Sequence, residues 1–222
     1  MKMIKIEGVT KSIKGSMVLE NVSMTAESGV VTGLSGINGS GKTMLMRVIA
    51  ALVKPSDGMV EIDGKLLWRD MAFPDSVGVL IENPAFLDTY TGFANLEMIA
   101  SIRNRVGKDR IGEVIRKVGL DPDDKKKYRK YSLGMKQRLG IAAAILEEPE
   151  IVLLDEPTNA LDSAGVDILK DIVFEEKARG ATVVITCHDQ VILHELADKV
   201  YFMESGRIVG YEDVGEEVGG VE

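Results

Sequence analysis

Eight consecutive residues have the types and spacing of a loop that binds phosphate. Residues 36–43 read G-x-x-x-x-G-K-T, between an apolar stretch predicted to be a strand and one predicted to be a helix. Glycines let backbone N–H groups curl around an anion, the helix N-terminus favours negative charge, and a lysine reaches the terminal phosphates. A plain glycine-rich turn is the alternative. We expect phosphate contacts from Gly36, Asn38, Gly39, Ser40, Gly41, Lys42 and Thr43, with Thr43 also holding Mg²⁺.

A second set of chemical groups follows the apolar run at residues 151–154. Asp155 and Glu156 end this predicted strand, which would place Asp155 toward Mg²⁺ through water and leave Glu156 to polarise an attacking water. Acidic residues at the end of a strand are often only solvated turn residues. Because a phosphate loop lies upstream, we expect Asp155 and Glu156 to form the second half of the same catalytic site.

Residues 131–138, Y-S-L-G-M-K-Q-R, lie just before a predicted helix and shortly before the acidic strand. This segment resembles the signature of the ABC ATPase family, LSGGQ followed by a Gln-Arg pair. Ser132, Gly134 and the pair at 137–138 match, whereas Tyr131, Leu133 and Met135 depart from it. Ser132 is also an N-cap candidate, and the helix that follows offers a second anion site. A capped helix without further function is the alternative.

The remaining family segments occur in the family's order. Residues 159–162 resemble the D-loop, and His188, directly after a second apolar run, resembles the switch histidine that contacts the γ-phosphate; an ordinary loop histidine is the alternative. The resemblance covers about residues 1–210. It implies ATP and Mg²⁺ as cofactors, catalysis by Glu156, His188 and Lys42, and metal binding by Thr43, Glu82 and Asp155. It also implies that the ATP of an opposite subunit is contacted by Ser132, Leu133, Gly134 and Met135. Asp162 would belong to the D-loop.

Two positions depart from the family pattern at the nucleotide. Glu82 aligns with the glutamine of the family's Q-loop, and its charge would repel a γ-phosphate about 5 Å away by about 3 kcal/mol at an effective dielectric of 20. It would therefore need Mg²⁺ nearby or a raised pKa. Ile13 stands where many members carry an aromatic residue under adenine, so we expect Ile13 and Val18 to pack on the base and binding to be weaker by a few-fold to about tenfold.

Two short segments narrow the resemblance. Residues 81–86, I-E-N-P-A-F, and residues 131–138 are similar to the ABC ATPases that serve bacitracin-type and lantibiotic-immunity exporters of Gram-positive bacteria. The family resemblance implies two further partners, a second copy of the chain in a head-to-tail ATP sandwich and an integral membrane permease. In this family the permease docks near residues 82–95, where Phe86, Leu87 and Tyr90 are plausible contacts.

The elements that must position these groups follow from the hydrophobic pattern. Strands are predicted at 3–7, 18–25, 30–34, 58–62, 151–154 and 181–186, and helices from residue 42 and at 93–103, 110–118, 133–146 and 162–178. The fold class is α/β: a P-loop NTPase core with a mixed sheet, flanking helices and an N-terminal antiparallel β subdomain. Within one domain, 1–222, we expect the core at 1–84 and 148–210, an inserted helical subdomain at 85–147 and an acidic tail at 211–222.

Composition limits the partners and the compartment. A net charge of −8 argues against binding nucleic acid through broad electrostatics, the single Cys187 cannot form an internal disulfide, and no run approaches the ~20 apolar residues of a spanning helix. We therefore expect a protein on the cytoplasmic face of the cell membrane, held there by the permease. Two alternatives stay open: a soluble ABC-type ATPase that acts on a cytosolic assembly, and a regulatory module that binds ATP without hydrolysing it.

Overall fold

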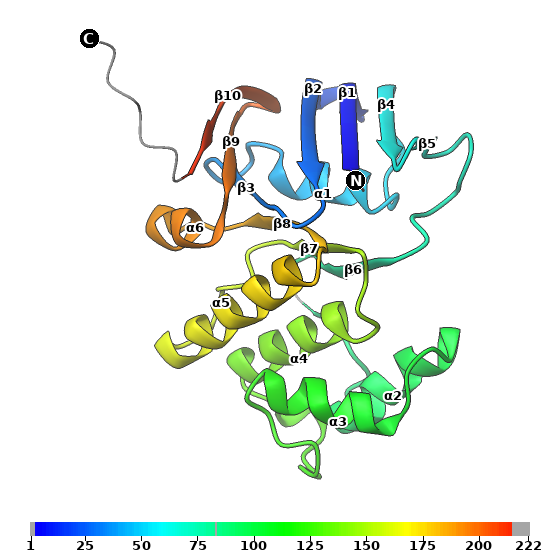
Figure 1. Cartoon of the computed structure of the whole chain (residues 1–222), viewed down its shortest axis with the longest axis vertical. Coiled ribbons are helices and arrows are strands. Elements are labelled where there is room, and N and C mark those ends of the chain that lie inside the picture. Colours follow the sequence, from blue (N-terminus) through cyan, green and yellow to red (C-terminus); the bar gives the residue numbers. More distant parts are fainter. Residues whose placement is uncertain (1–2, 83, 215–222) are drawn as a thin grey trace.

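The computed structural model describes residues 3–82 and 84–214, which form two sheets and a group of helices (Figure 1). The smaller sheet is antiparallel, with strand order β2-β1-β4-β5. Its strands are β1 (Met3–Ile13), β2 (Ser16–Glu27), β4 (Asp57–Ile62) and β5 (Lys65–Leu66). The predicted antiparallel β subdomain is therefore present.

Strands β1 and β2 are longer than the sequence pattern indicated. The alternation of buried and exposed residues in β1 is interrupted at Gly8, which has φ 61°, and the pairing register with β2 shifts between Ile6 and Val9. Such a bulge inserts one residue and reverses the faces on which later side chains lie. The period of two is lost at that point, so the pattern predicted an end where the strand continues.

The larger sheet is mixed, with strand order β10-β9-β3-β8-β7-β6. Five neighbouring strands are parallel and β10 pairs antiparallel at the edge. Every residue of β3, β7 and β8 is buried, as expected for parallel strands covered on both faces. The strands are β3 (Val31–Ser35), β6 (Val77–Leu80), β7 (Ile151–Leu154), β8 (Thr182–Thr186), β9 (Lys199–Glu204) and β10 (Arg207–Asp213).

Alternate side chains of the large sheet belong to two hydrophobic clusters. Leu34, Leu153 and Val184 pack with α1 (Lys42–Ile49) and the small sheet. Val152 and Ile185, on the opposite face, pack with helices. Figure 1 shows the result, with α1 near the small sheet at the top and the other large helices below the mixed sheet.

The remaining helices cover the second face. They are α2 (Gly92–Arg103), α3 (Lys108–Lys117), the 3₁₀ turn η1 (Tyr128–Lys130), α4 (Leu133–Ile145), α5 (Ser163–Ala178) and α6 (Gln190–Leu196). Helices α2, α3 and α4 lie within residues 85–147, and they share one hydrophobic cluster with the sheet. The contact is closest between β6 and α4, where a Cβ on Gly78 would lie 1.7 Å from the Ala144 carbonyl oxygen. Helix α4 therefore packs directly on the core.

The segment expected to be an acidic tail, residues 211–222, begins within strand β10. Strand β10 continues to Asp213, and the Val214 N–H donates to the Asp198 carbonyl. Cross-strand pairing with β9 holds this acidic segment in the sheet, whatever its composition. The rest of the expected tail, residues 215–222, lies outside the described residues. No helix among the described residues is long and apolar enough to span a membrane.

Candidate active site

The phosphate loop joins the carboxyl end of β3 to α1, and its shape requires glycine at two points. Gly36 has φ 153° and a Cβ there would lie 2.3 Å from the Met203 carbonyl oxygen. Gly41 has φ 107° and a Cβ would lie 3.0 Å from a methyl group of Leu19. Both conformations disfavour residues with side chains. The loop therefore keeps its backbone close to β9 and β2, and its curl is set by packing as well as by sequence.

Lys42, the first residue of α1, points back into this loop. Its side chain is buried, and Nζ donates to the carbonyl oxygens of Gly36 at 2.5 Å and Ile37 at 3.2 Å. An ammonium group has three N–H donors, so two hold the loop and one remains for an anion. The positive charge is therefore fixed where the loop curls.

Thr43, at the start of α1, and Asp155, directly after β7, lie together at one edge of the mixed sheet. The Thr43 hydroxyl donates to Asp155 Oδ2 at 2.7 Å, and the Thr186 hydroxyl donates to Oδ1 at 2.8 Å. The order β3-β8-β7 makes this meeting possible, because parallel strands end at the same edge. These oxygen groups fit Mg²⁺, which is usually bound through one or two carboxylates plus substrate phosphates. Among the described residues no three His, Cys, Asp or Glu side chains cluster to hold a metal alone.

Glu156 is positioned by β8. Its backbone N–H donates to the Thr186 hydroxyl at 2.8 Å, and the residue has φ 50°. Its Oε2 accepts the His188 backbone N–H at 3.1 Å, and His188 Nε2 lies 3.3 Å from Oε1. That second contact lacks hydrogen-bond alignment, so the buried Oε1 accepts no hydrogen bond from the described residues.

The electrostatic surroundings suit Glu156 to accept a proton. Burial raises its pKa above the ordinary carboxyl value, while the charges of His188 and Lys42 act in the opposite direction. A carboxylate with a raised pKa is a better base than a solvated one. The imidazole of His188 stays half exposed beside it.

Gln137 supports the same loop from α4, a role that the sequence analysis did not assign. Its side chain is buried, and Nε2 donates to the carbonyl oxygens of Glu156 at 3.2 Å and Pro157 at 3.1 Å. The signal available in the sequence was the match of residues 137–138 to the family's Gln-Arg pair. The contact ties the backbone of the proposed base to the helix that follows Ser132.

Arg138 makes the adjoining contact. Its guanidinium donates to Asp162 Oδ1 at 2.8 Å, and this oxygen also accepts the Gly165 N–H at 2.9 Å as the N-cap of α5. The Gly165 and Arg138 hydrogen bonds lower the pKa of the Asp162 carboxyl. The predicted D-loop aspartate is therefore held by the helix of the predicted signature.

The four predicted signature residues form a separate surface at the start of α4. Ser132 is the N-cap and accepts the Met135 N–H at 3.2 Å. A Cβ on Gly134 would lie 2.8 Å from the Ala160 carbonyl oxygen, and Leu133 is 74% exposed. With Asp162 and Arg138 they line a shallow cleft of about 600 Å³. The structure does not bring them to the phosphate loop of the same chain.

The phosphate loop opens on its own cleft of about 290 Å³. This volume is at the lower limit for a small-molecule site. Ile13, expected near the base, is not among the lining residues and is 40% exposed. Met44 and Arg47 line the cleft, although neither was predicted from the sequence to do so. The full lining is Val18, Asn38, Gly39, Gly41, Lys42, Thr43, Met44, Arg47, Glu82 and Glu156.

Glu82 lies in this cleft but contacts a residue that was not foreseen. It follows β6 with φ 60°, and its Oε1 lies 2.6 Å from Nη2 of Arg47 in the last turn of α1. The sequence predicted that Mg²⁺ or protonation would offset the charge of Glu82. In the structure, the guanidinium of Arg47 offsets this charge instead.

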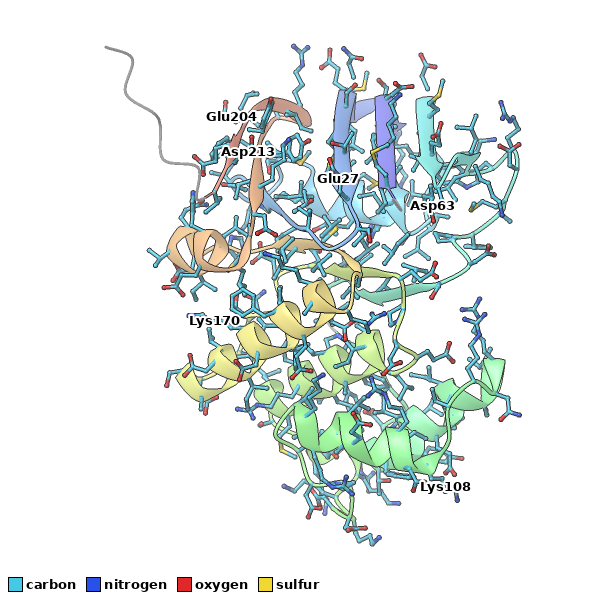
Figure 2. The ribbon with its side chains drawn as sticks, in the orientation of Figure 1. Glu27, Asp63, Lys108, Lys170, Glu204 and Asp213 are labelled. Atoms are coloured by element: carbon cyan, nitrogen blue, oxygen red, sulfur yellow. The ribbon has the colours of Figure 1, made fainter. Side chains whose placement is uncertain are left out.

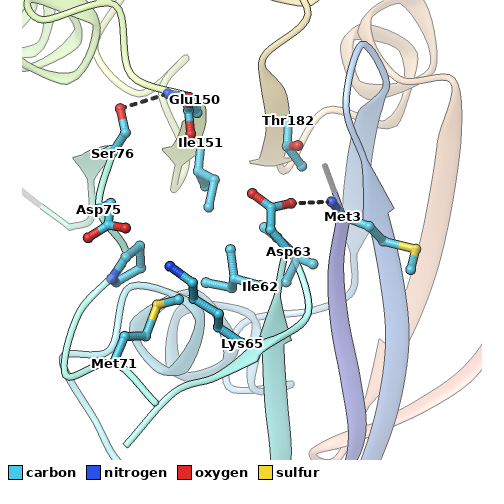
Figure 3. A pocket seen from close by; sticks show the side chains of 12 residues that line it. Met3, Ile62, Asp63, Lys65, Met71, Asp75, Ser76, Glu150, Ile151 and Thr182 are labelled. Carbon is cyan, nitrogen blue, oxygen red and sulfur yellow. Dashed lines mark hydrogen bonds between the residues drawn. The ribbon is translucent and has the colours of Figure 1, made fainter. Parts of the chain in front are cut away.

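A second, smaller pocket lies at the opposite edge of the mixed sheet (Figure 3). It is lined by Met3, Ile151 and Thr182, from the amino ends of β1, β7 and β8. Asp63 accepts the Met3 N–H there, and Ser76 accepts the Glu150 N–H. Its volume of about 60 Å³ is too small for a nucleotide. The proposed chemistry therefore belongs to the other edge, at the carboxyl ends of the strands.

Comparison with known proteins gives consistent matches. The family model described as ABC transporter matches residues 19–159. The uncharacterized ABC transporter ATP-binding protein YybJ of Bacillus subtilis is 46% identical over 212 residues, covering 96% of this chain and 97% of its own length. The bacitracin transport ATP-binding protein BcrA of Enterococcus faecalis is 35% identical, covering 96% of this chain and 70% of its own.

Two further similarities concern a transport protein and a solved structure. The lantibiotic transport ATP-binding protein SrtF of Streptococcus pyogenes is 34% identical, covering 93% of this chain and 89% of its own length. A dimeric, post-hydrolysis structure of the ATP-binding cassette MJ0796 bound to ADP and Pi superimposes with a TM-score of 0.85 at 25% identity, covering 96% of this chain and 100% of that one.

Proposed function

Because this chain belongs to the ABC transporter family of ATP-binding proteins, we propose that it drives a separate membrane permease that exports an antimicrobial peptide or another hydrophobic compound. ATP binding and ATP hydrolysis come with the family. The observation that carries the catalytic part is the meeting of Thr43, Asp155, Glu156 and His188 beneath the phosphate loop.

The arrangement supports hydrolysis at the γ-phosphate. The loop N–H groups and Lys42 would bind the β- and γ-phosphates, and His188 would contact the γ-phosphate. Glu156 takes a proton from water as the water oxygen attacks γ-phosphorus and the bond to the β–γ bridging oxygen breaks, giving ADP and inorganic phosphate. Mg²⁺ held by Thr43 and Asp155 would neutralise charge on the phosphate oxygens. Glu82 lines the same cleft and is an additional candidate ligand.

A second copy of the chain would complete the site. The phosphate cleft is small and open, and the signature surface around Ser132 lies elsewhere on the molecule. A head-to-tail pair would place each signature surface over the partner's ATP, which closes the pair because γ-phosphate adds contacts that ADP lacks. The dimeric structure of the MJ0796 cassette supports this arrangement.

The charge distribution also favours head-to-tail pairing. Basic residues outnumber acidic ones between 85 and 147, whereas the rest of the chain carries the acidic excess behind the net charge of −8. In Figure 2, Glu27, Asp63, Glu204 and Asp213 lie over the sheets at the top, and Lys108 lies on α3 at the bottom. Complementary surfaces steer association and select orientation. The helical part of one copy would thus be attracted to the core of the other.

The permease would dock in an apolar groove beside the loop of Glu82. The groove has a volume of about 590 Å³, and Ile102, 81% exposed, lies on its rim. Exposed apolar grooves of this kind mark interaction sites. Tyr90, expected as a contact, is exposed but does not line it. The lining residues are Ala85, Phe86, Leu87, Asn95, Met98, Ile99 and Ile102. Binding there would keep the chain at the cytoplasmic face of the membrane.

The substrate class rests on the relatives. BcrA is a bacitracin transport protein and SrtF a lantibiotic transport protein by name, and both resemble this chain over nearly its whole length. Both names point to peptide antibiotics. We therefore place the exported compound in that class.

Affinity purification from gently solubilised membranes tests the proposal. We expect the wild-type chain to recover a multi-spanning permease in stoichiometric amount. Ile102→Asp should abolish recovery, and Met17→Asp, at an exposed site on β2, should not. Cells that lack the permease should become more sensitive to a peptide antibiotic. Recovery of cytosolic partners alone would instead favour a soluble ABC-type ATPase.

A further inference from the structure

The cleft of the phosphate loop contains an ion pair, and its carboxylate lines the same cleft as Lys42 and Thr43. Glu82 reaches it from the end of β6, and Arg47 reaches it from α1, with 2.6 Å between Oε1 and Nη2. Thr43 and Glu156 line the same cleft. The pair is therefore part of the nucleotide-binding surface.

An unpaired carboxylate here would oppose ATP binding. Two unit charges about 5 Å apart, at an effective dielectric of 20, repel strongly enough to weaken binding on the order of a hundredfold. The family's pattern at this position is a neutral glutamine. A chain with glutamate needs a compensating positive charge in the same cleft.

The pair contributes little to the fold itself. The Arg47 side chain is 32% exposed and that of Glu82 59% exposed, and ion pairs so open to water add little to stability. Among the described residues, Glu82 is the carboxylate with which Arg47 pairs. The position of Arg47 is therefore explained better by the negative charge of Glu82 in the cleft than by a contribution to folding stability.

We propose that Arg47 is a positioning residue for ATP. Arg47 neutralises Glu82, so that the pair presents no net negative charge to the γ-phosphate. The inference rests on the nucleotide site proposed above. The counter-charge of Arg47 acts before any metal binds. As ATP fills the cleft and displaces water, the attraction between the two side chains grows because the local dielectric falls.

A double-mutant cycle tests this proposal with Arg47→Ala, Glu82→Gln and the double variant. Binding of a fluorescent ATP analogue is measured in EDTA, which removes the metal from the comparison. We expect Arg47→Ala to weaken binding about 10- to 100-fold, Glu82→Gln to change it by less than about threefold, and the double variant to return within about threefold of Glu82→Gln. Rescue by the neutral partner is an effect that a purely structural arginine would not show.

Two further measurements sharpen the result. Raising the salt concentration should reduce the penalty of Arg47→Ala, because salt screens exposed charges. In steady-state kinetics the same variant should raise KM for MgATP by about 5- to 50-fold with kcat within about threefold, since the lost interaction concerns binding. Arg69→Ala is the matched control, because Arg69 pairs with Asp70 at 3.0 Å on an exposed surface outside the cleft.

Two outcomes would overturn the inference. Equal losses from Arg47→Ala with and without Glu82→Gln would show that Arg47 contacts the nucleotide on its own account. No loss at all would show that Glu82 needs no counter-charge. Failure of the wild-type chain to bind the analogue would instead remove the nucleotide site, so the two failures are distinguishable.

Discussion

Thr43 and Asp155 are joined by a hydrogen bond of 2.7 Å from the threonine Oγ1 to the carboxylate Oδ2, although 112 positions separate them in the sequence. The bond links the start of α1 to the end of β7 across the large sheet. Both residues are proposed to hold Mg²⁺, so metal binding would exchange this contact for contacts to the ion. The two halves of the site are thus in register before nucleotide arrives.

Replacing Thr43 by valine should separate the metal contribution from nucleotide binding. The change keeps the shape and removes the hydroxyl, so we expect ATP affinity in EDTA to stay within about threefold while the gain on adding Mg²⁺ is lost. ATPase activity should fall by about 100-fold or more, a size typical of lost transition-state charge stabilisation. Nucleotide titrations with and without Mg²⁺ check this. Equal weakening in both conditions would show that Thr43 acts on the loop rather than on the metal.

Glu156→Gln should abolish turnover and preserve ATP-driven dimerisation. The amide keeps the size of the side chain and cannot accept a proton, and general-base catalysis contributes about 10²- to 10⁴-fold. In the wild-type protein, kcat/KM should fall as pH falls through the pKa of Glu156, which burial raises above the ordinary value of 4.5. Size-exclusion chromatography and phosphate release measure the two effects. Turnover by the variant near the wild-type rate would contradict the assignment of the base.

Gly78→Ala should destabilise the protein without touching the site. A Cβ there would lie 1.7 Å from the Ala144 carbonyl oxygen, so β6 and α4 would have to move apart. We expect a loss of about 3 kcal/mol, as for other overpacked interiors. Urea unfolding measures it. Gly107→Ala is the control, because a Cβ at Gly107 meets nothing within 4 Å and its φ is −97°; similar losses in both variants would contradict this account.

His194 should make stability depend on pH. Its Nδ1 lies 2.6 Å from the Gln190 carbonyl oxygen and its Nε2 contacts Glu212 on β10. These contacts raise the pKa of His194 above 6.5, with the Gln190 hydrogen bond as the largest cause and burial opposing it. The stabilisation is therefore fully present below pH 6.5 and is lost as pH rises through the folded-state pKa.

Comparing the wild-type protein with Glu212→Gln at two pH values checks the predicted direction of the pH dependence of stability. The difference in melting temperature should be larger at pH 6 than at pH 8.5, because only the protonated imidazole attracts the carboxylate. Glu20→Gln is the matched control, since Glu20 pairs with Arg207, whose charge does not change in this range. A difference that is the same at both pH values would show that His194 is not the titrating partner.

Elements whose signals are local could be predicted from the residue pattern alone. The glycines and Lys42 of the phosphate loop, the apolar runs of β7 and β8, and the N-cap Ser132 all appear in the structure where the pattern placed them. Each depends on neighbours within a few residues, through turn conformation, capping or burial on both faces. The α/β fold and the ABC family followed from their order.

Contacts between side chains that are far apart in the chain could not be predicted in this way, because they depend on how the elements pack. The strand order β3-β8-β7 brings Thr43 to Asp155, α4 brings Gln137 to the backbone of Glu156, and α1 brings Arg47 to Glu82. The tertiary structure also left Ile13 outside the cleft and drew residues 211–213 into β10. These outcomes depend on packing and strand pairing between segments far apart in the chain, which no local pattern of residue types encodes.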